Sequence, residues 1–525
     1  MSRPRVLVRE TIADAGVDFL RERFDVDVDG SADLGATIGD YDAIVIRSAT
    51  KLTADLIERG ERLKVIGRAG VGVDNVDVEA ATRRGIVVAN APESTVTSAS
   101  EHTVGLLVAL ARNIPQAHAA LKGGRWERSR WNGVELAGKS LGVVGFGRIG
   151  QQVARRAIGL GMTVVAYDPF VGSDRFRELG VERAETLDAL LAASDVVTLH
   201  SPLNDETHCL IDRETIARMR DGARLVNAAR GALVDEDALV EALRSGKLAG
   251  AALDVFSAEP YEGPLLELDQ VVVTPHLAAS TDEAQDRAGL IVAEQVVAAL
   301  DGGIVSNAVN IPVVDQADLE VLGPFIPLAA LLGRIAVALA GARPHRVAVA
   351  AYGPLSEYDT RLLTAAALNG AFQEWVDQVV NVVNAPLIAA ERGIEVVEER
   401  NRASRDYTNT VEVTIVSEGE EATVSGTTIG PEPRLFLGGA LGFGIDLEIG
   451  PHMVFIRYAD QPGVIGRVGS MFGEAGVNIA NMAVSRTIEG GEALMVFSID
   501  TPATAELVDA LHEAGFDDVR FVELG

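Results

Sequence analysis

The expected fold of this chain is decided by residues 140–169, which read SLGVVGFGRIGQQVARRAIGLGMTVVAYDP. The apolar run at 141–144 predicts a buried strand, and GFGRIG at 145–150 matches the pattern G-x-G-x-x-G. Apolar residues then recur at helical spacing, and a second apolar run at 164–167 ends at Asp168. A bare glycine motif is weak evidence, but strand, motif, helix, strand and acid in this order predict the first βαβ unit of a Rossmann fold.

The glycines and the acid have separate physical roles in such a unit. Gly145 allows a tight turn, Gly147 lets the backbone approach a pyrophosphate, and Gly150 lets the helix pack closely on the strand. Unpaired N–H groups and the dipole at the helix N-terminus favour an anion. Asp168 is placed to accept hydrogen bonds from a ribose 2′-hydroxyl and would repel a 2′-phosphate, so we expect NAD and not NADP. A glycine-rich turn without a ligand is the weaker alternative.

Composition limits the classes of function. The 525 residues predict about three or four domains. The formal charge of −30, from 46 basic and 76 acidic residues, argues against nonspecific nucleic-acid binding. The single cysteine, Cys209, excludes an internal disulfide and a cysteine-rich metal site, and we expect no bound metal. The N-terminus leads into a strand-like run at 6–8 without a secretory segment, so we expect a cytoplasmic protein.

One apolar segment, residues 321–342, is long enough to span a bilayer. It contains Arg334 near its middle, together with Pro324 and Pro327. Because a central arginine is costly in lipid, we expect a buried or subunit-interface helix and no contact with a membrane.

The first 98 residues alternate strand-like runs with polar, helix-compatible stretches, which is typical of a parallel α/β sheet. The strand-like runs lie at 5–9, 43–47, 64–67 and 86–89. Apolar spacing predicts one long helix over 97–121 and another over 281–300, on either side of the Rossmann unit. We therefore expect the chain to leave its first domain and return to it, with a cleft between the two domains.

The C-terminal third has two further parts. Residues 318–451 are rich in Ala and Gly, with a helix predicted at 361–376 and strands at 410–416 and 422–428, and they show no catalytic constellation. Residues 452–525 read β-α-β-β-α-β, a ferredoxin-like plan.

The predicted fold class is α/β: a Rossmann dinucleotide-binding domain inserted in a discontinuous flavodoxin-like domain, then an α+β domain and a ferredoxin-like βαββαβ domain. The predicted ranges are 1–98 with 283–317 for the substrate domain, 99–282 for the NAD domain, 318–451 for the intervening domain and 452–525 for the terminal domain.

A nicotinamide enzyme needs a proton acceptor and a cation that holds the substrate. His276 follows a strand-like run at 270–274, at the edge of the sheet where ligands bind in α/β folds; His200 also ends a strand and is its competitor. Glu259 follows the strand before it and could hydrogen-bond the imidazole. Arg230 follows another strand, and its planar fork suits a carboxylate beside a carbonyl. Three such groups at successive strand ends argue against coincidence.

The motifs VGFGRIG, NAARGALVDEDAL, AALDVFSAEP and TPHLAAST resemble the signatures of the D-isomer-specific 2-hydroxyacid dehydrogenases. RSATK at 47–51 and GRAGVGVDNVD at 67–77 narrow the resemblance to members that oxidise 3-phospho-D-glycerate with NAD, which opens the serine pathway. The C-terminal part resembles their long form, with an intervening domain and an ACT regulatory domain. Phe146, Ala278 and Ser100 depart from the usual residues without removing a reactive group.

The resemblance implies roles for individual residues. His276 would be the general acid/base, supported by Glu259, and Arg230 would bind the carboxylate and polarise the carbonyl. Further substrate contacts would come from Arg47 and Thr50 on the phosphate and from the N–H groups of Gly70 and Val71 on the carboxylate. Cofactor contacts would come from Gly145, Gly147, Arg148, Ile149, Gly150, Asp168, Ser201, Ala228 and Asp254.

In the terminal domain, Tyr458, Asp460 and Asn478 match positions where ACT domains bind effector amino acids across a dimer seam, so serine is the expected effector. An assembly domain without a ligand is the alternative there. The resemblance also implies a homotetramer. For the whole chain, the alternatives are a hydroxypyruvate or glyoxylate reductase of the same family and a non-enzymatic NAD-sensing corepressor scaffold.

Overall fold

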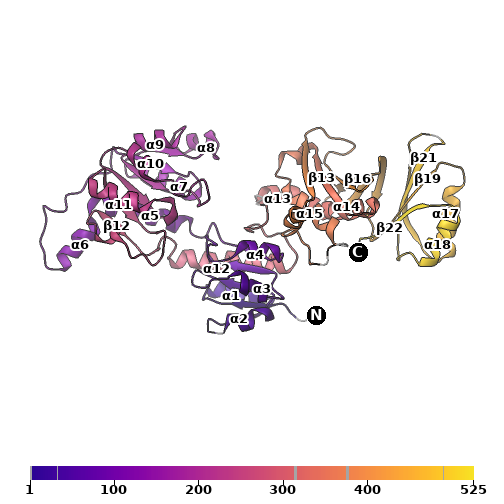
Figure 1. The fold of residues 1–525 in the computed structure, drawn as a ribbon, viewed down its shortest axis with the longest axis horizontal. Coiled ribbons are helices and arrows are strands. Elements are labelled where there is room, and N and C mark those ends of the chain that lie inside the picture. Colours follow the sequence, from indigo (N-terminus) through magenta and orange to yellow (C-terminus); the bar gives the residue numbers. More distant parts are fainter. Residues whose placement is uncertain are drawn as a thin grey trace.

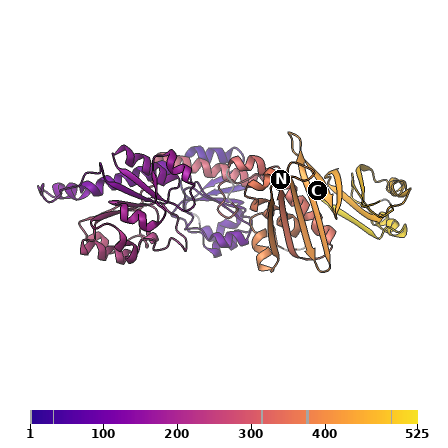
Figure 2. The ribbon, with the colours of Figure 1, turned by 90° about the horizontal axis from the view of Figure 1, so that it is seen from above.

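The computed structural model describes residues 3–31, 33–312, 316–373, 376, 378–488 and 490–524. Within these ranges the chain forms an elongated molecule with four sheets, each accompanied by its own helices (Figures 1 and 2). The N-terminal half forms two parallel sheets, and the C-terminal half forms a mixed sheet and an antiparallel sheet. This confirms the expected fold class.

The largest sheet has seven parallel strands in the order β12-β11-β10-β9-β6-β7-β8. The strands are β6 (Ser140–Val144), β7 (Thr163–Tyr167), β8 (Glu182–Arg183), β9 (Val196–Leu199), β10 (Ala223–Asn227), β11 (Leu248–Leu253) and β12 (Val271–Val273). They alternate with α7 (Arg148–Gly159), α8 (Ser173–Glu178), α9 (Leu187–Ala193), α10 (Arg213–Arg218) and α11 (Glu236–Ser245). The central strands are apolar and buried because helices cover both faces. The strand order reverses between β6 and β9, as in a Rossmann fold.

The second parallel sheet has the order β2-β1-β3-β4-β5, which is the flavodoxin-like order. Its strands are β1 (Arg5–Val8), β2 (Asp25–Val28), β3 (Ala43–Ile46), β4 (Val65–Arg68) and β5 (Val87–Ala89). Its helices are α1 (Asp14–Arg21), α2 (Leu34–Thr37), α3 (Ala54–Arg59) and α4 (Val78–Arg83). The edge strand β2 was not predicted because its sequence, DVDV, is exposed and polar at alternate positions.

Two helices lie where the chain passes between these sheets, α5 (Val96–Arg112) and α12 (Asp282–Leu300). The single helix predicted over 97–121 is wrong. α5 ends at Asn113, whose φ of 52° is left-handed, and a second helix, α6 (Ile114–Lys122), starts with a proline in its first turn. Both features interrupt the helical hydrogen bonds. In Figure 1, α6 stands away from the sheet.

The intervening part is a six-stranded mixed sheet in the order β14-β13-β15-β16-β17-β18. The strands are β13 (Pro344–Tyr352), β14 (Glu395–Asn401), β15 (Thr410–Ser417), β16 (Glu420–Ile429), β17 (Arg434–Ala440) and β18 (Phe443–Glu448). Its helices are α13 (Gln316–Leu322), α14 (Phe325–Ala340), α15 (Arg361–Phe372) and α16 (Ala385–Glu391). The helix predicted over 361–376 is α15, which ends at Phe372; residues 374 and 375 lie outside the described residues.

The apolar segment at 321–342 contains all of α14, whose side chains pack into the core of the intervening part. The segment also includes the end of α13, which Gly323 and Pro324 separate from α14. Leu328, Leu332 and Ile335 are completely buried there. No helix in the described ranges combines the length and apolarity needed to cross a membrane.

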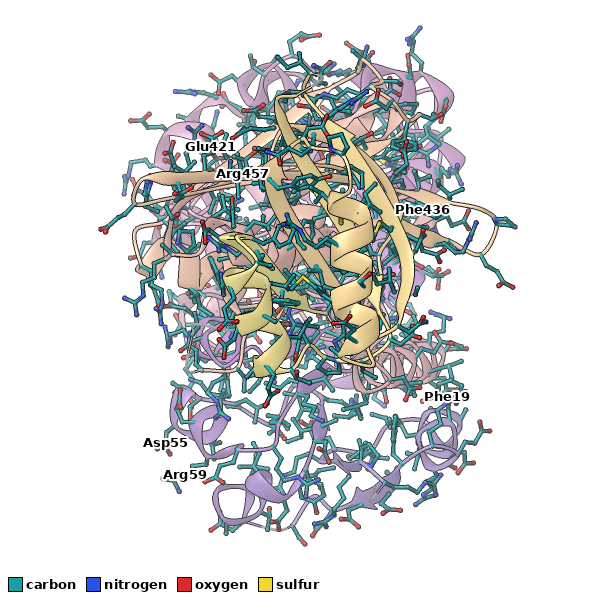
Figure 3. All side chains as sticks on the ribbon, turned by 90° about the vertical axis from the view of Figure 1, so that its right-hand side faces the viewer. Phe19, Asp55, Arg59, Glu421, Phe436 and Arg457 are labelled. Carbon is teal, nitrogen blue, oxygen red and sulfur yellow. The ribbon has the colours of Figure 1, made fainter. Side chains whose placement is uncertain are left out.

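The terminal domain has four antiparallel strands in the order β20-β21-β19-β22, with two helices over one face. The strands are β19 (His452–Ala459), β20 (Ile479–Arg486), β21 (Glu492–Ile499) and β22 (Asp518–Glu523), and the helices are α17 (Val464–Glu474) and α18 (Ala505–Glu513). This is the predicted ferredoxin-like plan. Glu421 on β16 and Arg457 on β19 line a cavity between this domain and the intervening sheet (Figure 3).

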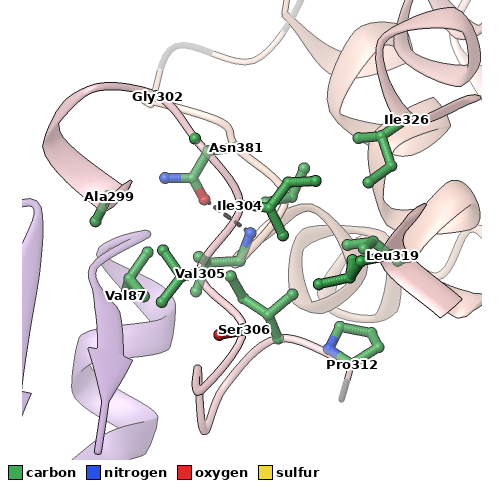
Figure 4. A pocket seen from close by; sticks show the side chains of 15 residues that line it. Val87, Ala299, Gly302, Ile304, Val305, Ser306, Pro312, Leu319, Ile326 and Asn381 are labelled. Carbon is green, nitrogen blue, oxygen red and sulfur yellow. Dashed lines mark hydrogen bonds between the residues drawn. The ribbon is translucent and has the colours of Figure 1, made fainter. Parts of the chain in front are cut away.

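The flavodoxin-like part and the intervening part meet at a second cavity, of about 320 Å³. Its lining is mostly aliphatic and includes Val87, Ile304, Leu319 and Ile326 (Figure 4). Beside it, the Asn381 side chain donates a 2.7 Å hydrogen bond to the carbonyl of Gly85. This contact ties the intervening part to the loop that precedes β5.

Candidate active site

The loop between β6 and α7 leaves space for an anion at the helix N-terminus. Gly145 has a φ of 89°, and a Cβ there would lie 2.6 Å from the carbonyl carbon of His200. A Cβ on Gly150 would collide with the carbonyl oxygen of Gly145, whereas a Cβ on Gly147 would meet no atom within 4 Å. The first turn of α7 carries no acidic side chain. Open space in front of unpaired N–H groups fits a dinucleotide pyrophosphate.

Asp168 lies directly after β7, beside the glycine loop. Its Oδ2 accepts a 2.8 Å hydrogen bond from the Phe146 N–H, and its Oδ1 accepts one of 2.9 Å from the Phe170 N–H. These bonds fix the carboxylate at the carboxyl end of β7. The placement suits a ribose hydroxyl, and it follows the order of parts expected from the sequence.

His276 and Glu259 form a close pair at the carboxyl ends of β12 and β11. The Nδ1 of His276 lies 2.8 Å from Oε2 of Glu259, while Oε1 of Glu259 accepts a 3.1 Å bond from the Phe256 N–H. Because a carboxylate only accepts, Nδ1 carries a hydrogen, and in the neutral form of the imidazole Nε2 holds the lone pair. The two side chains are 51% and 38% exposed, so the imidazole is accessible to a substrate.

His200, the alternative histidine, has a different environment. Burial lowers the pKa of His200 to about 4, so its imidazole is neutral near pH 7. Its Nε2 lies 3.0 Å from the Thr198 hydroxyl, and no carboxylate is recorded as its partner in the described part of the chain. A neutral imidazole without a carboxylate partner to orient it is less suited to acid/base catalysis, which favours His276 as the acid/base.

The Arg230 side chain faces the loop after β4 of the flavodoxin-like sheet. It follows β10, and the next residue, Gly231, touches the backbone of Phe256, so a Cβ at 231 would collide with it. The Nε of Arg230 lies 3.7 Å from Oδ2 of Asp74, in the loop after β4. Arg230 therefore stands between the two sheets, close to the loop that carries Glu259.

The loop after β3 carries Arg47 and Thr50, and Glu10 holds its shape. The Glu10 carboxylate accepts bonds of 2.9–3.1 Å from the N–H groups of Arg47, Ala49 and Thr50. Burial opposes ionisation of Glu10, but these bonds and one from the Thr50 hydroxyl outweigh it, so its pKa is lowered. Asn75 donates to the carbonyls of Arg47 and Thr50 at 2.7 and 2.6 Å. The expected phosphate loop is thereby tied to the loop after β4.

A third arginine, Arg68, lies at the end of β4, close enough to Arg47 and Arg230, the predicted substrate ligands, for their charges to act on it. Its Nε is buried and has no hydrogen-bond partner among the described residues. Burial lowers the pKa of Arg68, and the positive charges of Arg230 and Arg47 lower it further. A Cβ at Gly70 would collide with its guanidinium. Sequence reasoning read this stretch for its glycines and missed the arginine among them.

The remaining predicted cofactor residues lie along the same edge of the Rossmann sheet. Ser201 and Ala228 follow β9 and β10, and Ile149 lies in the first turn of α7. The Nη1 of Arg148 lies 2.8 Å from Oε1 of Glu93, on the segment that enters α5. Asp254 follows β11, but its side chain is completely buried and bonded to the His276 loop. Its predicted contact with NAD stays a prediction.

The predicted effector residues are apart within one chain. Tyr458 and Asp460 lie at the end of β19, whereas Asn478 precedes β20, which runs parallel to β19 with β21 between them. Asn478 therefore lies at the opposite end of the sheet, where it donates a 2.7 Å bond to Asp500. Asp460 accepts a 3.1 Å bond from Arg486. Burial raises the pKa of Tyr458, and the charge of Asp460 adds to this.

Cavities support the same choice of site. A cavity of about 530 Å³ lies beside His276 and Glu259 and is also lined by Phe256, Tyr261 and Thr274. The cavity at the junction with the intervening part is nearly all aliphatic and has no titratable side chain in its lining. Acid/base chemistry therefore fits the His276 edge.

Three family models match separate parts of the chain. Residues 104–278 match the D-isomer specific 2-hydroxyacid dehydrogenase, NAD binding domain; residues 321–436 match the D-3-phosphoglycerate dehydrogenase intervening domain; and residues 452–516 match the ACT domain.

Relatives match along the whole length. The D-3-phosphoglycerate dehydrogenase of Archaeoglobus fulgidus is 43% identical, over 99% of this chain and 100% of that protein. The enzyme of the same name from Methanocaldococcus jannaschii is 42% identical, with the same coverage. The crystal structure of a glyoxylate reductase from Paecilomyes thermophila superposes with a TM-score of 0.55 at 31% identity, over 59% of this chain and 99% of that one.

Proposed function

The chain belongs to the D-3-phosphoglycerate dehydrogenase family, and from this premise we propose that His276, Glu259 and Arg230 carry out its NAD-dependent reaction. The reaction oxidises 3-phospho-D-glycerate to 3-phosphohydroxypyruvate and is the first step of L-serine biosynthesis. We also propose the domain limits expected from the sequence, with the substrate held between residues 1–98 and 283–317 on one side and 99–282 on the other.

In the proposed mechanism, the Nε2 lone pair of His276 takes the proton from the C2 hydroxyl of the substrate. Glu259 orients the imidazole through Nδ1 and stabilises the imidazolium that forms, as their 2.8 Å contact allows. The Arg230 fork binds the carboxylate and polarises the C2 oxygen as it becomes a carbonyl. NAD, when bound, supplies the hydride acceptor, and the glycine loop of α7 with Asp168 would hold it.

One observation carries the choice of substrate. Arg47 and Arg230 come from two loops and Arg68 from the end of β4, and the charges of Arg47 and Arg230 both lower the pKa of Arg68, in a chain whose net charge is −30. Asp74 and Glu10 offset part of this positive charge, and the remaining positive charge suits an anionic ligand. A phosphate and a carboxylate on one small molecule provide two anionic groups. We propose that Arg230 takes the carboxylate, together with the N–H groups of Gly70 and Val71, and that Arg47, Thr50 and Arg68 take the phosphate.

The phosphate assignment predicts a strong substrate preference that depends on Arg47. The parent enzyme should use 3-phosphoglycerate far better than unphosphorylated D-glycerate in steady-state assays. Arg47→Ala should lower kcat/KM for 3-phosphoglycerate about 10- to 100-fold, because charge-assisted hydrogen bonds contribute about 1.5–3 kcal/mol. Its kcat/KM for D-glycerate should hardly change.

Arg59→Ala is the matched control for Arg47→Ala. Arg59 lies on the same sheet's α3, where it forms a 2.9 Å surface ion pair with Asp55 (Figure 3). This variant should behave like the parent. Equal use of both acids by the parent would contradict the assignment and favour a reductase that acts on unphosphorylated acids.

We further propose that the ACT domain binds L-serine between two copies of this chain. β20 is an edge strand and exposes Val484, and Ile488, just after the strand, is also exposed. Both features suit antiparallel pairing with β20 of a second copy. Such pairing would bring Asn478 of one copy toward Tyr458 and Asp460 of the other. The homotetramer implied by the resemblance stays a prediction.

This site predicts feedback inhibition. Millimolar L-serine should lower initial rates of the intact enzyme, and D-serine should not. Asn478→Ala should raise the half-inhibitory concentration about tenfold, the effect of one lost hydrogen bond of about 1–1.5 kcal/mol. Absence of inhibition by millimolar L-serine would contradict this part of the proposal and leave the dehydrogenase assignment untouched.

A further inference from the structure

A buried hydrogen-bonded cluster lies beneath the loop that carries His276. Asp254 is completely buried after β11, and its carboxylate accepts 2.8 Å bonds from the N–H groups of Leu277 and Ala278. Its backbone carbonyl accepts a 2.9 Å bond from the His276 N–H. The backbone N–H groups of three successive residues, 276–278, therefore all donate hydrogen bonds to Asp254. His276 has a φ of 55°, a left-handed conformation that the surrounding contacts must maintain.

Asp254 stays ionised in this position. Burial alone would raise its pKa, but hydrogen bonds from His102, Thr274 and the two N–H groups outweigh burial and lower the pKa of Asp254. A buried carboxylate with this many donors is fixed in direction. Loss of one donor would leave charge unpaired and release part of that constraint.

His102 supplies one of these donors from outside the loop. Its Nε2 lies 3.2 Å from Oδ1 of Asp254 and 3.1 Å from the Thr274 hydroxyl oxygen. The Thr274 hydroxyl donates its one hydrogen bond to Oδ1 of Asp254, at 2.5 Å. Since both oxygens near Nε2 then act as acceptors, Nε2 carries a hydrogen and shares it between them.

His102 also connects the catalytic loop to the passage between the two parallel sheets. It lies on α5, the helix that leads from the flavodoxin-like sheet into the Rossmann sheet. At the start of α5, the Ser98 hydroxyl lies 2.8 Å from the Thr281 hydroxyl, and Arg287 donates two bonds to the carbonyl of Ser94. Both crossing segments of the chain are thus joined where α5 begins.

We propose that His102 is a positioning residue for the dehydrogenase reaction. From α5, its Nε2–H clamps Asp254 and Thr274, and this cluster sets the loop at 274–278 so that the His276 imidazole faces the substrate. His102 would act through Asp254 and Thr274, without contacting substrate or cofactor itself. The inference rests on the proposed function for its substrate and extends it to a residue on a helix that the two domains share.

The test compares three variants of the intact enzyme. His102→Gln places an amide N–H the same number of bonds from Cβ as Nε2, His102→Asn ends one bond short, and His102→Leu fills space without a donor. His102→Asn and His102→Leu should lose about 10- to 100-fold in kcat, since misplacement of a reacting group by about 1 Å costs up to about 10²-fold. His102→Gln should keep most of the parent kcat.

Each outcome decides the proposal. Loss in His102→Asn and His102→Leu with rescue in His102→Gln supports it. Equal kcat in all four enzymes overturns it, because the cluster would then have no effect on turnover. An equal loss of kcat in all three variants also overturns it, because that would indicate simple packing. If the parent oxidises another 2-hydroxy acid in place of 3-phosphoglycerate, the proposed function fails, and the same comparison with that acid still tests His102.

Discussion

Replacement of His276 with alanine is expected to lower kcat by about 10²–10⁴, the usual share of general acid/base catalysis. Arg230 would still bind the substrate carboxylate, but no side chain would take the proton from the C2 hydroxyl. NAD binding should persist, because the predicted cofactor contacts lie on other loops. Stopped-flow or steady-state assays of 3-phosphoglycerate oxidation measure the loss, and fluorescence titration measures NAD affinity.

His345→Ala is the control for this variant. His345 is an exposed residue of β13, in the intervening sheet. It should retain the parent rate. A His276→Ala enzyme with more than about a tenth of the parent kcat would contradict the role of His276 as acid/base, and His200 would then need the same test.

Replacement of Arg230 with glutamine is expected to lower kcat/KM by about 10²–10³, as loss of a charge-stabilising donor in an active site does. Glutamine keeps polarity and part of the length but loses the charge and the fork that can hold a carboxylate and the C2 oxygen together. KM should rise because Arg230 binds the substrate carboxylate, and kcat should fall because Arg230 also polarises the developing carbonyl. Steady-state assays across substrate concentrations separate the two effects.

Arg244→Gln is the control for Arg230→Gln. Arg244 is an exposed arginine in the last turn of α11, on the same sheet. This variant should match the parent in both parameters. If Arg230→Gln changed KM alone and left kcat unchanged, Arg230 would bind the substrate without polarising the carbonyl, and that half of its role would be wrong.

The Rossmann unit could be predicted from sequence because its signals are local. Strand, glycine motif, helix and acid follow one another within residues 140–169, and each has a single steric or electrostatic role. The candidate residues Arg230, Glu259 and His276 could be named because each follows a strand, and parallel strands end at one edge of the sheet. The structure places Glu259 and His276 in contact and Arg230 beside the Glu259 loop, as strand order alone could only suggest.

Contacts between residues far apart in the sequence could not be predicted from local patterns. Glu10 shapes the Arg47 loop from 37 residues away, and His102 reaches Asp254 across 152 residues. Nothing near either residue in the sequence marks the partner. The break at Asn113 was missed for another reason: apolar spacing continues through it, and the following proline fits the first turn of a new helix.

The intervening part was the least predictable region. β17 and the edge strand β18 read RLFLGGA and FGIDLE, and glycine within a strand weakens the pattern from which strands are recognised. The terminal domain was predicted strand by strand because its apolar runs alternate cleanly with two amphipathic helices. The effector site proposed for it could not be placed from sequence, because that proposal requires a second copy of the chain.

A crystal structure of the intact enzyme with NAD and 3-phosphoglycerate would show whether His276 and Arg230 act on the substrate. We expect Nε2 of His276 within about 3 Å of the C2 oxygen, the distance that proton transfer requires, with the Arg230 guanidinium on the carboxylate of the same molecule. A substrate whose C2 oxygen lies beyond hydrogen-bond reach of His276, with Arg230 still paired to Asp74, would contradict it.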